Sequence, residues 1–149
     1  MLWKTRLSIF SILLAVGVPA GASKASLAEL KSEPKLEKRA AMALSFADSA
    51  VDTSRKAWMA GDMAAFKRNL EEVAEAVDLV LHSLRETGKA PGKMLKHYKR
   101  AELKTRDLGR RLQTLENDVA FDDREFVAGI KDRVHDIHEE LLFAIMSKR

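Results

Sequence analysis

The sequence has no cysteine among its 149 residues. The chain therefore cannot form a disulfide, a thiolate metal site, an iron–sulfur cluster, a cysteine nucleophile or a covalently attached c-type haem. Proline and glycine are also sparse, with three and seven residues, and 46% of the chain is hydrophobic. This composition excludes a disordered or fibrous protein, and the length suits one globular domain.

The N-terminus carries the features of a secretory signal peptide. Lys4 and Arg6 precede the apolar segment Leu7–Val18, and Ala20-Gly21-Ala22 forms a small-residue cleavage site. As a helix, that apolar segment spans roughly 18 Å, against about 30 Å for a bilayer core, which disfavours an uncleaved anchor. We predict that residues 1–22 are removed and that the protein is periplasmic or secreted. No later segment is apolar enough to span a membrane.

The rest of the chain has apolar residues at helical spacing in four segments of similar length. The clearest segment shows steps of three and four, as in a coiled-coil seam. Its apolar residues are Met63, Phe66, Leu70, Val73, Val77, Val80 and Leu84. Gly61 and Gly88 are predicted to end helices, and Asp62 to cap one. Asp122 is expected to cap the last helix in a capping box with Glu125. After a polar tether at 23–33, a unit at 34–149 is predicted, with helices over about 35–60, 63–87, 92–117 and 123–147.

These helices and short turns predict an all-α fold, an antiparallel up-down-up-down four-helix bundle. The alternative is a stack of two helical hairpins, because the segment from Trp58 to Phe66 resembles a tetratricopeptide-like turn. Those repeats use helices about half as long, which favours the bundle.

Charge is distributed unevenly over the predicted helices. Residues 88–111 hold nine basic and two acidic residues, whereas 62–87 and 118–149 each have a net charge of −3. One interpretation is an anion-binding face. The other is pairing with acidic helices on both sides, which neutralises the basic helix. The candidate contact residues are Lys96, Lys99, Arg100, Lys104, Arg106 and Arg111.

The four histidines raise the question of a metal or haem site. His135 and His138 share a helix face with Glu139, so these three residues are the candidate metal ligands. The Glu-x-x-His repeats of di-iron bundles are missing. A non-covalent haem would pair Met42 with His138, as in cytochrome b562-like bundles.

Three segments resemble a family of small exported all-α bacterial proteins of unassigned function. They are Ser83–Gly88 (SLRETG), Lys96–Leu112 (KHYKRAELKTRDLGRRL) and Asp122–Phe126. The resemblance implies export and helicity, and it supplies no catalytic or ligand residue.

The chain also lacks a nucleophile elbow, a glycine-rich dinucleotide turn and a pair of core-facing carboxylates. We therefore expect a protein that is not an enzyme, has no catalytic residue and needs no cofactor. It is expected to act by binding or structural interaction in the cell envelope, with an envelope protein or an anionic polymer as partner. Nucleic acid is not expected, and self-association into a homo-oligomer is a further option. The alternative function is a metal- or haem-binding bundle.

Overall fold

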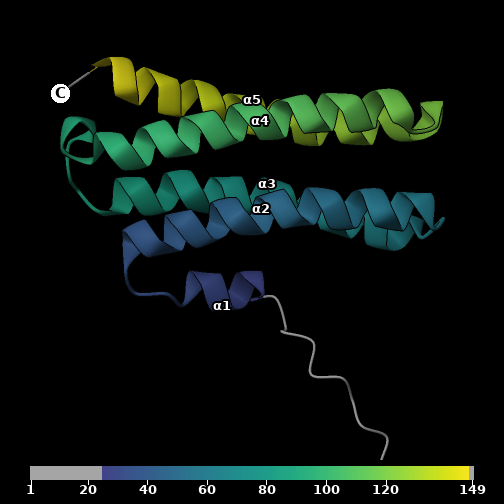
Figure 1. Ribbon diagram of the computed structural model, residues 1–149, viewed down its shortest axis with the longest axis horizontal. Coiled ribbons are helices and arrows are strands. Elements are labelled where there is room, and N and C mark those ends of the chain that lie inside the picture. The colour runs from purple at the N-terminus through teal and green to yellow at the C-terminus, as the bar shows by residue number, and fades with distance from the viewer. Residues whose placement is uncertain (1–24, 148–149) are drawn as a thin grey trace, which may run out of the picture.

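The computed structural model describes residues 25–147, and all regular secondary structure in this range is helical. The all-α prediction is therefore confirmed. The predicted signal peptide at 1–22 lies outside the described residues. No helix within the described range has both the length and the apolarity to cross a membrane. The elements (Figure 1) are α1 Leu27–Lys31, α2 Leu36–Met59, α3 Met63–Glu86, the 3-10 helix η1 Pro91–Met94, α4 Leu95–Asp118 and α5 Phe121–Ser147.

The turn between α2 and α3 forms as its sequence predicts. Gly61 has a φ of 74°, a left-handed conformation that glycine adopts without steric cost. The next residue, Asp62, caps α3, because its side chain accepts a hydrogen bond from the backbone N–H of Ala65 at 3.0 Å. Gly88, with a φ of 68°, follows the C-cap residue of α3 in the same way.

Two helix starts differ from the sequence prediction. α4 begins at Leu95 rather than near residue 92, because Pro91–Met94 first forms a turn of 3-10 helix. α5 begins at Phe121, so Asp122 lies in its first turn and not at the cap. The backbone carbonyl of Ala120 accepts the N–H of Asp123 there. The predicted capping role of Asp122 is therefore wrong.

The segment expected to be a polar tether contains the short helix α1. Ser26 and Glu29 form a reciprocal capping box, in which each side chain accepts from the other residue's backbone N–H. Leu30 is 2% exposed and joins the core, while Lys31 lies 3.6 Å from Glu75 of α3. One buried leucine and a good cap are enough to fix a single helical turn against the neighbouring helices.

The long helices lie in two layers, with α2 and α3 in one and α4 and α5 in the other (Figure 1). Ion pairs fix how the layers align. Lys89, just before α4, is 3.1 Å from Glu37 at the start of α2, and Arg55 near the end of α2 pairs with Asp118 at the end of α4. The start of α2 therefore lies beside the start of α4, and the end of α2 beside the end of α4, so the two helices are aligned along their whole length.

The order of neighbours differs from the expected one. α4 packs mainly on α5 and also on α2, and it has little contact with α3. α3 in turn packs on α2 and α5. The chain thus crosses diagonally between the layers after α3, through residues 87–94. The expectation that the basic helix lies between two acidic helices is wrong, because one of its two main neighbours is α2, with four basic and three acidic residues.

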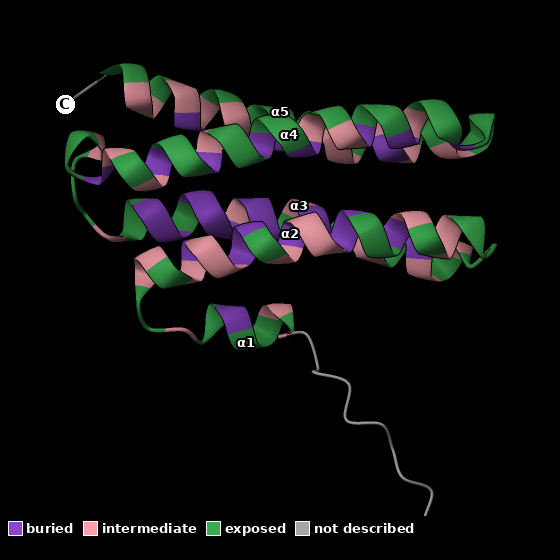
Figure 2. Ribbon diagram, in the orientation of Figure 1, coloured by how far each residue is buried: buried purple, intermediate pink, exposed green. Residues whose placement is uncertain are grey.

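The core follows the predicted apolar seams and extends beyond them in α3 (Figure 2). Helix α3 contacts α1, α2 and α5, so it is buried over more than one stripe. On α2 the buried face consists largely of small residues, with Ala43 and Ala47 both at 0% exposure. Additional buried residues of α3, outside the predicted seam, are Ala76, Leu79, Leu81 and Ser83.

The buried Tyr98 on α4 gives a testable dependence of stability on pH. Burial raises the pKa of its phenol, against a smaller opposing effect of Arg85. Above about pH 10 the unfolded chain ionises first, so the free energy of unfolding is expected to fall as the pH rises through this range. Tyr98 is the only tyrosine, so tyrosinate absorbance follows it alone. A folded Tyr98 that titrates as it does in urea would contradict this, and Tyr98→Phe should make the loss of stability above pH 10 smaller.

Candidate anion-binding surface and the cleft between α4 and α5

The N-terminal half of α4 carries four exposed cationic side chains that form no ion pair within residues 25–147. Because the apolar seam of α4 turns inward at Tyr98, Ala101, Thr105 and Leu108, the intervening basic residues face solvent. Successive members are one to four residues apart, so they are spread over about two helical turns. All are exposed and form no ion pair within 4 Å among residues 25–147: Lys96, Lys99, Arg100 and Lys104.

The two other predicted contact residues are already engaged within the protein. Arg106 lies 3.1 Å from the carboxylate of Glu102, one turn earlier on α4. Arg111 pairs with both Asp48 and Asp52 of α2, and its side chain is 28% exposed. These arginines therefore contribute to the fold, and Arg111 in particular connects the two layers. Unlike the four unpaired cations, these two arginines are therefore not available to an external ligand.

Two charged residues of the acidic helix α5 pair with α3. Arg133 pairs with Asp78 of α3, and Glu140 lies 2.6 Å from Arg85 of the same helix. These contacts connect α5 to α3, and in the described residues no carboxylate of α5 lies within 4 Å of the four exposed cations of α4. Of the six candidates, Arg106 is paired with Glu102 of its own helix and Arg111 with two aspartates of α2, so neither is neutralised by an acidic neighbouring helix.

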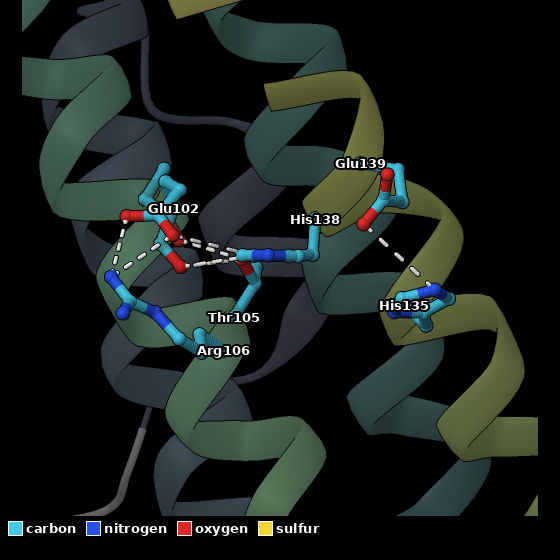
Figure 3. Close-up of polar contacts among 7 residues, drawn as sticks. Glu102, Thr105, Arg106, His135, His138 and Glu139 are labelled. Carbon is cyan, nitrogen blue, oxygen red and sulfur yellow. Dashed lines mark hydrogen bonds and ion pairs between the residues drawn. The ribbon is translucent and has the colours of Figure 1, made fainter. Parts of the chain in front are cut away.

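A buried polar contact joins α4 and α5 behind this surface (Figure 3). His138 of α5 points toward α4, and its Nδ1 lies 3.3 Å from the backbone carbonyl of Glu102 and 3.4 Å from the hydroxyl of Thr105. The Glu102 carboxylate is 3.8 Å from the same nitrogen. The side chains of His138 and Glu102 are only 14% and 12% exposed. Together they fix the register between the two helices.

The hydrogen-bond partners of His138 indicate its tautomer. The Thr105 hydroxyl lies within hydrogen-bonding distance of carbonyls of its own helix, so its oxygen is free to accept. With carbonyl and hydroxyl oxygens beside it, Nδ1 is placed to donate a hydrogen bond to them. In a catalytic triad the nucleophile and the acid lie at opposite ring nitrogens. Here both lie at Nδ1, so the cluster does not have triad geometry.

A polar cleft of about 480 Å³ lies beside this contact, between α4 and α5. Its lining mixes basic, imidazole and amide side chains. Lys131, on its α5 wall, is held by Gln113 at 2.8 Å and by Glu116. The full lining is Thr105, Arg106, Gly109, Arg110, Gln113, Lys131, Asp132, His135 and His138.

The three candidate metal ligands do not converge. His135 is an exposed residue whose Nε2 lies 3.9 Å from Glu139, whereas His138 is directed at α4 (Figure 3). The two imidazole rings are stacked with centroids 6.3 Å apart. Within the described residues, no group of three or more metal-ligating side chains comes together. The structure therefore gives the metal-binding alternative no preformed site.

The pairing of Met42 with His138 expected for haem does not occur. Met42 is on α2 and His138 on α5, and these helices make no contact in the described part of the chain. Met42 instead packs at the edge of the core, on the side of α2 near α1. The expected pairing requires the first and last helices to be neighbours, which they are not.

Polar groups are few in the core of residues 25–147. The buried polar residues are Ser54, Ser83 and Thr105, and none is ionisable. Ser54 donates to the carbonyl of Val51 in its own helix, at 2.8 Å. Such local bonds satisfy the hydroxyl without creating a site.

The contact between Glu102 and His138 was missed by sequence reasoning. Thr105 lies on the buried face of α4, but nothing in the sequence shows which residue of a later helix lies opposite it. A comparison with protein-family models, with curated proteins and with solved structures found no match to this chain.

Proposed function

We propose that this chain is exported and acts without catalysis, as an antiparallel four-helix bundle whose α4 surface binds an anionic partner in the cell envelope. The observation that carries the proposal is the set of four exposed cations in the N-terminal half of α4 that have no acidic partner within 4 Å among residues 25–147. A surface of one sign raises the local concentration of oppositely charged ligands.

Export is supported by the sequence of residues 1–22 and by the resemblance to small exported all-α proteins. Two basic residues, an apolar segment and a small-residue site occur there in the order that signal peptides require. Removal of this segment would take two positive charges and leave the α4 surface unchanged.

An anionic polymer suits the surface better than a nucleic acid. The cations are spaced along a helix, so they can meet repeated anionic groups on an extended chain. Binding of single-stranded nucleic acid usually adds aromatic side chains on which bases stack. The aromatic residue of α4, Tyr98, is 3% exposed and therefore offers no stacking platform.

The test removes three of the four cations in the variant Lys96→Gln/Lys99→Gln/Lys104→Gln. The full chain is titrated with poly-L-glutamate at several salt concentrations. Each lysine near an anionic surface contributes about 1 kcal/mol, so the variant should bind about 100-fold more weakly and with a weaker dependence on salt.

The matched control removes three exposed cations elsewhere, in Lys35→Gln/Lys56→Gln/Arg68→Gln. It has the same net charge as the test variant. It should bind almost as the parent chain does. Equal weakening by both variants, or no binding by the parent chain at low salt, would overturn the proposal.

A further inference from the structure

An apolar groove runs along the outer side of α2, separate from the cleft between α4 and α5. It has a volume of about 390 Å³. Ligand pockets commonly range from about 300 to 1,000 Å³, so the groove is large enough for a small ligand. The residues that line it come from α1, α2, α4 and the segment just before α1: Ala25, Leu30, Lys38, Ala41, Met42, Ser45, Phe46, Ser49 and Arg100.

The floor of the groove is made by one face of α2. Met42 and Phe46 are half-buried, and both pack against the core with their inner sides. Leu30 of α1 forms a wall, and α1 is held in place by its capping box and by the contact of Lys31 with Glu75. The groove is therefore a defined part of the fold, and it forms because α1 lies along α2 without covering it.

The charges at the groove are all positive. Lys38 and Arg100 line it, and no carboxylate does. Lys38 lies 2.8 Å from Glu33, so its charge is already compensated. Arg100 has no such ion pair in the described range, and it reaches the groove from the neighbouring helix α4. A ligand that matches this arrangement has an apolar chain and a single negative group.

We propose that the groove binds a free fatty acid, with its alkyl chain against Met42 and Phe46 and its carboxylate at Arg100. Burial of each methylene group from water favours binding. The guanidinium of Arg100 can donate two parallel hydrogen bonds to a carboxylate. Ser45 and Ser49 add hydroxyl groups that can donate further hydrogen bonds. This binding does not depend on the polymer surface, although Arg100 belongs to both.

The test titrates the full chain with dodecanoate by isothermal calorimetry. Saturable binding of one molecule is expected in the groove. Ser45→Trp places a large side chain in the groove from an exposed position, and it should abolish this binding. Arg100→Gln should weaken it about tenfold, the usual effect of losing a charge-assisted hydrogen bond. Circular dichroism checks that each variant is folded.

Lys104→Gln is the matched control, because it removes an equal charge one turn away on α4 and outside the groove. It should bind dodecanoate like the parent chain while binding poly-L-glutamate more weakly. Ser45→Trp should show the reverse pattern, which separates this proposal from the polymer proposal. Dodecyltrimethylammonium should not displace dodecanoate. Unchanged dodecanoate binding by folded Ser45→Trp and Arg100→Gln would overturn the proposal.

Discussion

Replacing Phe66 by alanine is expected to lower the free energy of unfolding by about 3–5 kcal/mol. Phe66 is 0% exposed and has the largest side chain among the fully buried residues of the described range. It lies in the first turn of α3, next to the turn from α2. Alanine would remove the ring and leave a cavity, which helices fixed at both ends can only partly close. Urea denaturation followed by circular dichroism measures the loss.

The control for Phe66→Ala is Phe143→Ala, the same change at a position that is 73% exposed. Because that ring is mostly in water already, the expected change is within about 0.5 kcal/mol. The urea concentration at the midpoint of unfolding should be lower for Phe66→Ala. The slope of the unfolding free energy against urea should stay nearly constant, as for a loss of stability without a change in the unfolded state. A loss below about 1 kcal/mol would show that residue 66 is not part of a tightly packed core.

The position of Phe66 could be predicted from the sequence, because it belongs to a seam with steps of three and four. Every seam residue from Phe66 to Leu84 is buried in the structure. The caps at Asp62 and Gly88 were also predicted correctly, since they depend on local backbone chemistry. Periodicity and capping are properties of one segment, and a sequence shows them directly.

The neighbours of each helix could not be predicted in the same way. A seam shows that Leu108 and Leu112 face a core, but several helices offer an equally apolar face. The short connection after α3 predicts that α4 packs beside α3. In the structure, residues 87–94 instead cross between the layers, so α4 packs on α2 and α5. The order is set by how the side chains of the two layers fit together, and this is not a local property.

The residues of the candidate site likewise divide into those whose exposure the sequence predicts and those whose contacts it does not. That Lys96 and Lys104 are exposed follows from their place opposite the seam of α4. That Arg111 is bound by Asp48 follows from the contact of α2 with α4, which the sequence does not reveal. The capping box of α1 was not predicted, because residues 23–33 are short and polar and were interpreted as a tether.

The alanine seam of α2 leads to a second prediction of large effect. Ala40, Ala43, Ala47 and Ala50 are at most 5% exposed, and α2 makes its most extensive contact with α3. Small side chains let two helices lie close together, since their distance depends on the residues at the contact. Ala47→Leu puts a larger side chain at a position that has no exposed surface. We expect it to cost about 1–3 kcal/mol, although leucine is more apolar and helix propensity changes little.

Ala41→Leu is the matched control for Ala47→Leu, since it adds an equal side chain to the same helix at a half-buried position beside the groove. Its unfolding free energy should stay within about 0.5 kcal/mol of the parent value. Urea denaturation of both variants measures the difference. A stabilising Ala47→Leu would mean that α2 and α3 lie far enough apart for a larger residue. Close packing at Ala47 would then not explain why α2 presents alanine where the other seams present leucine and valine.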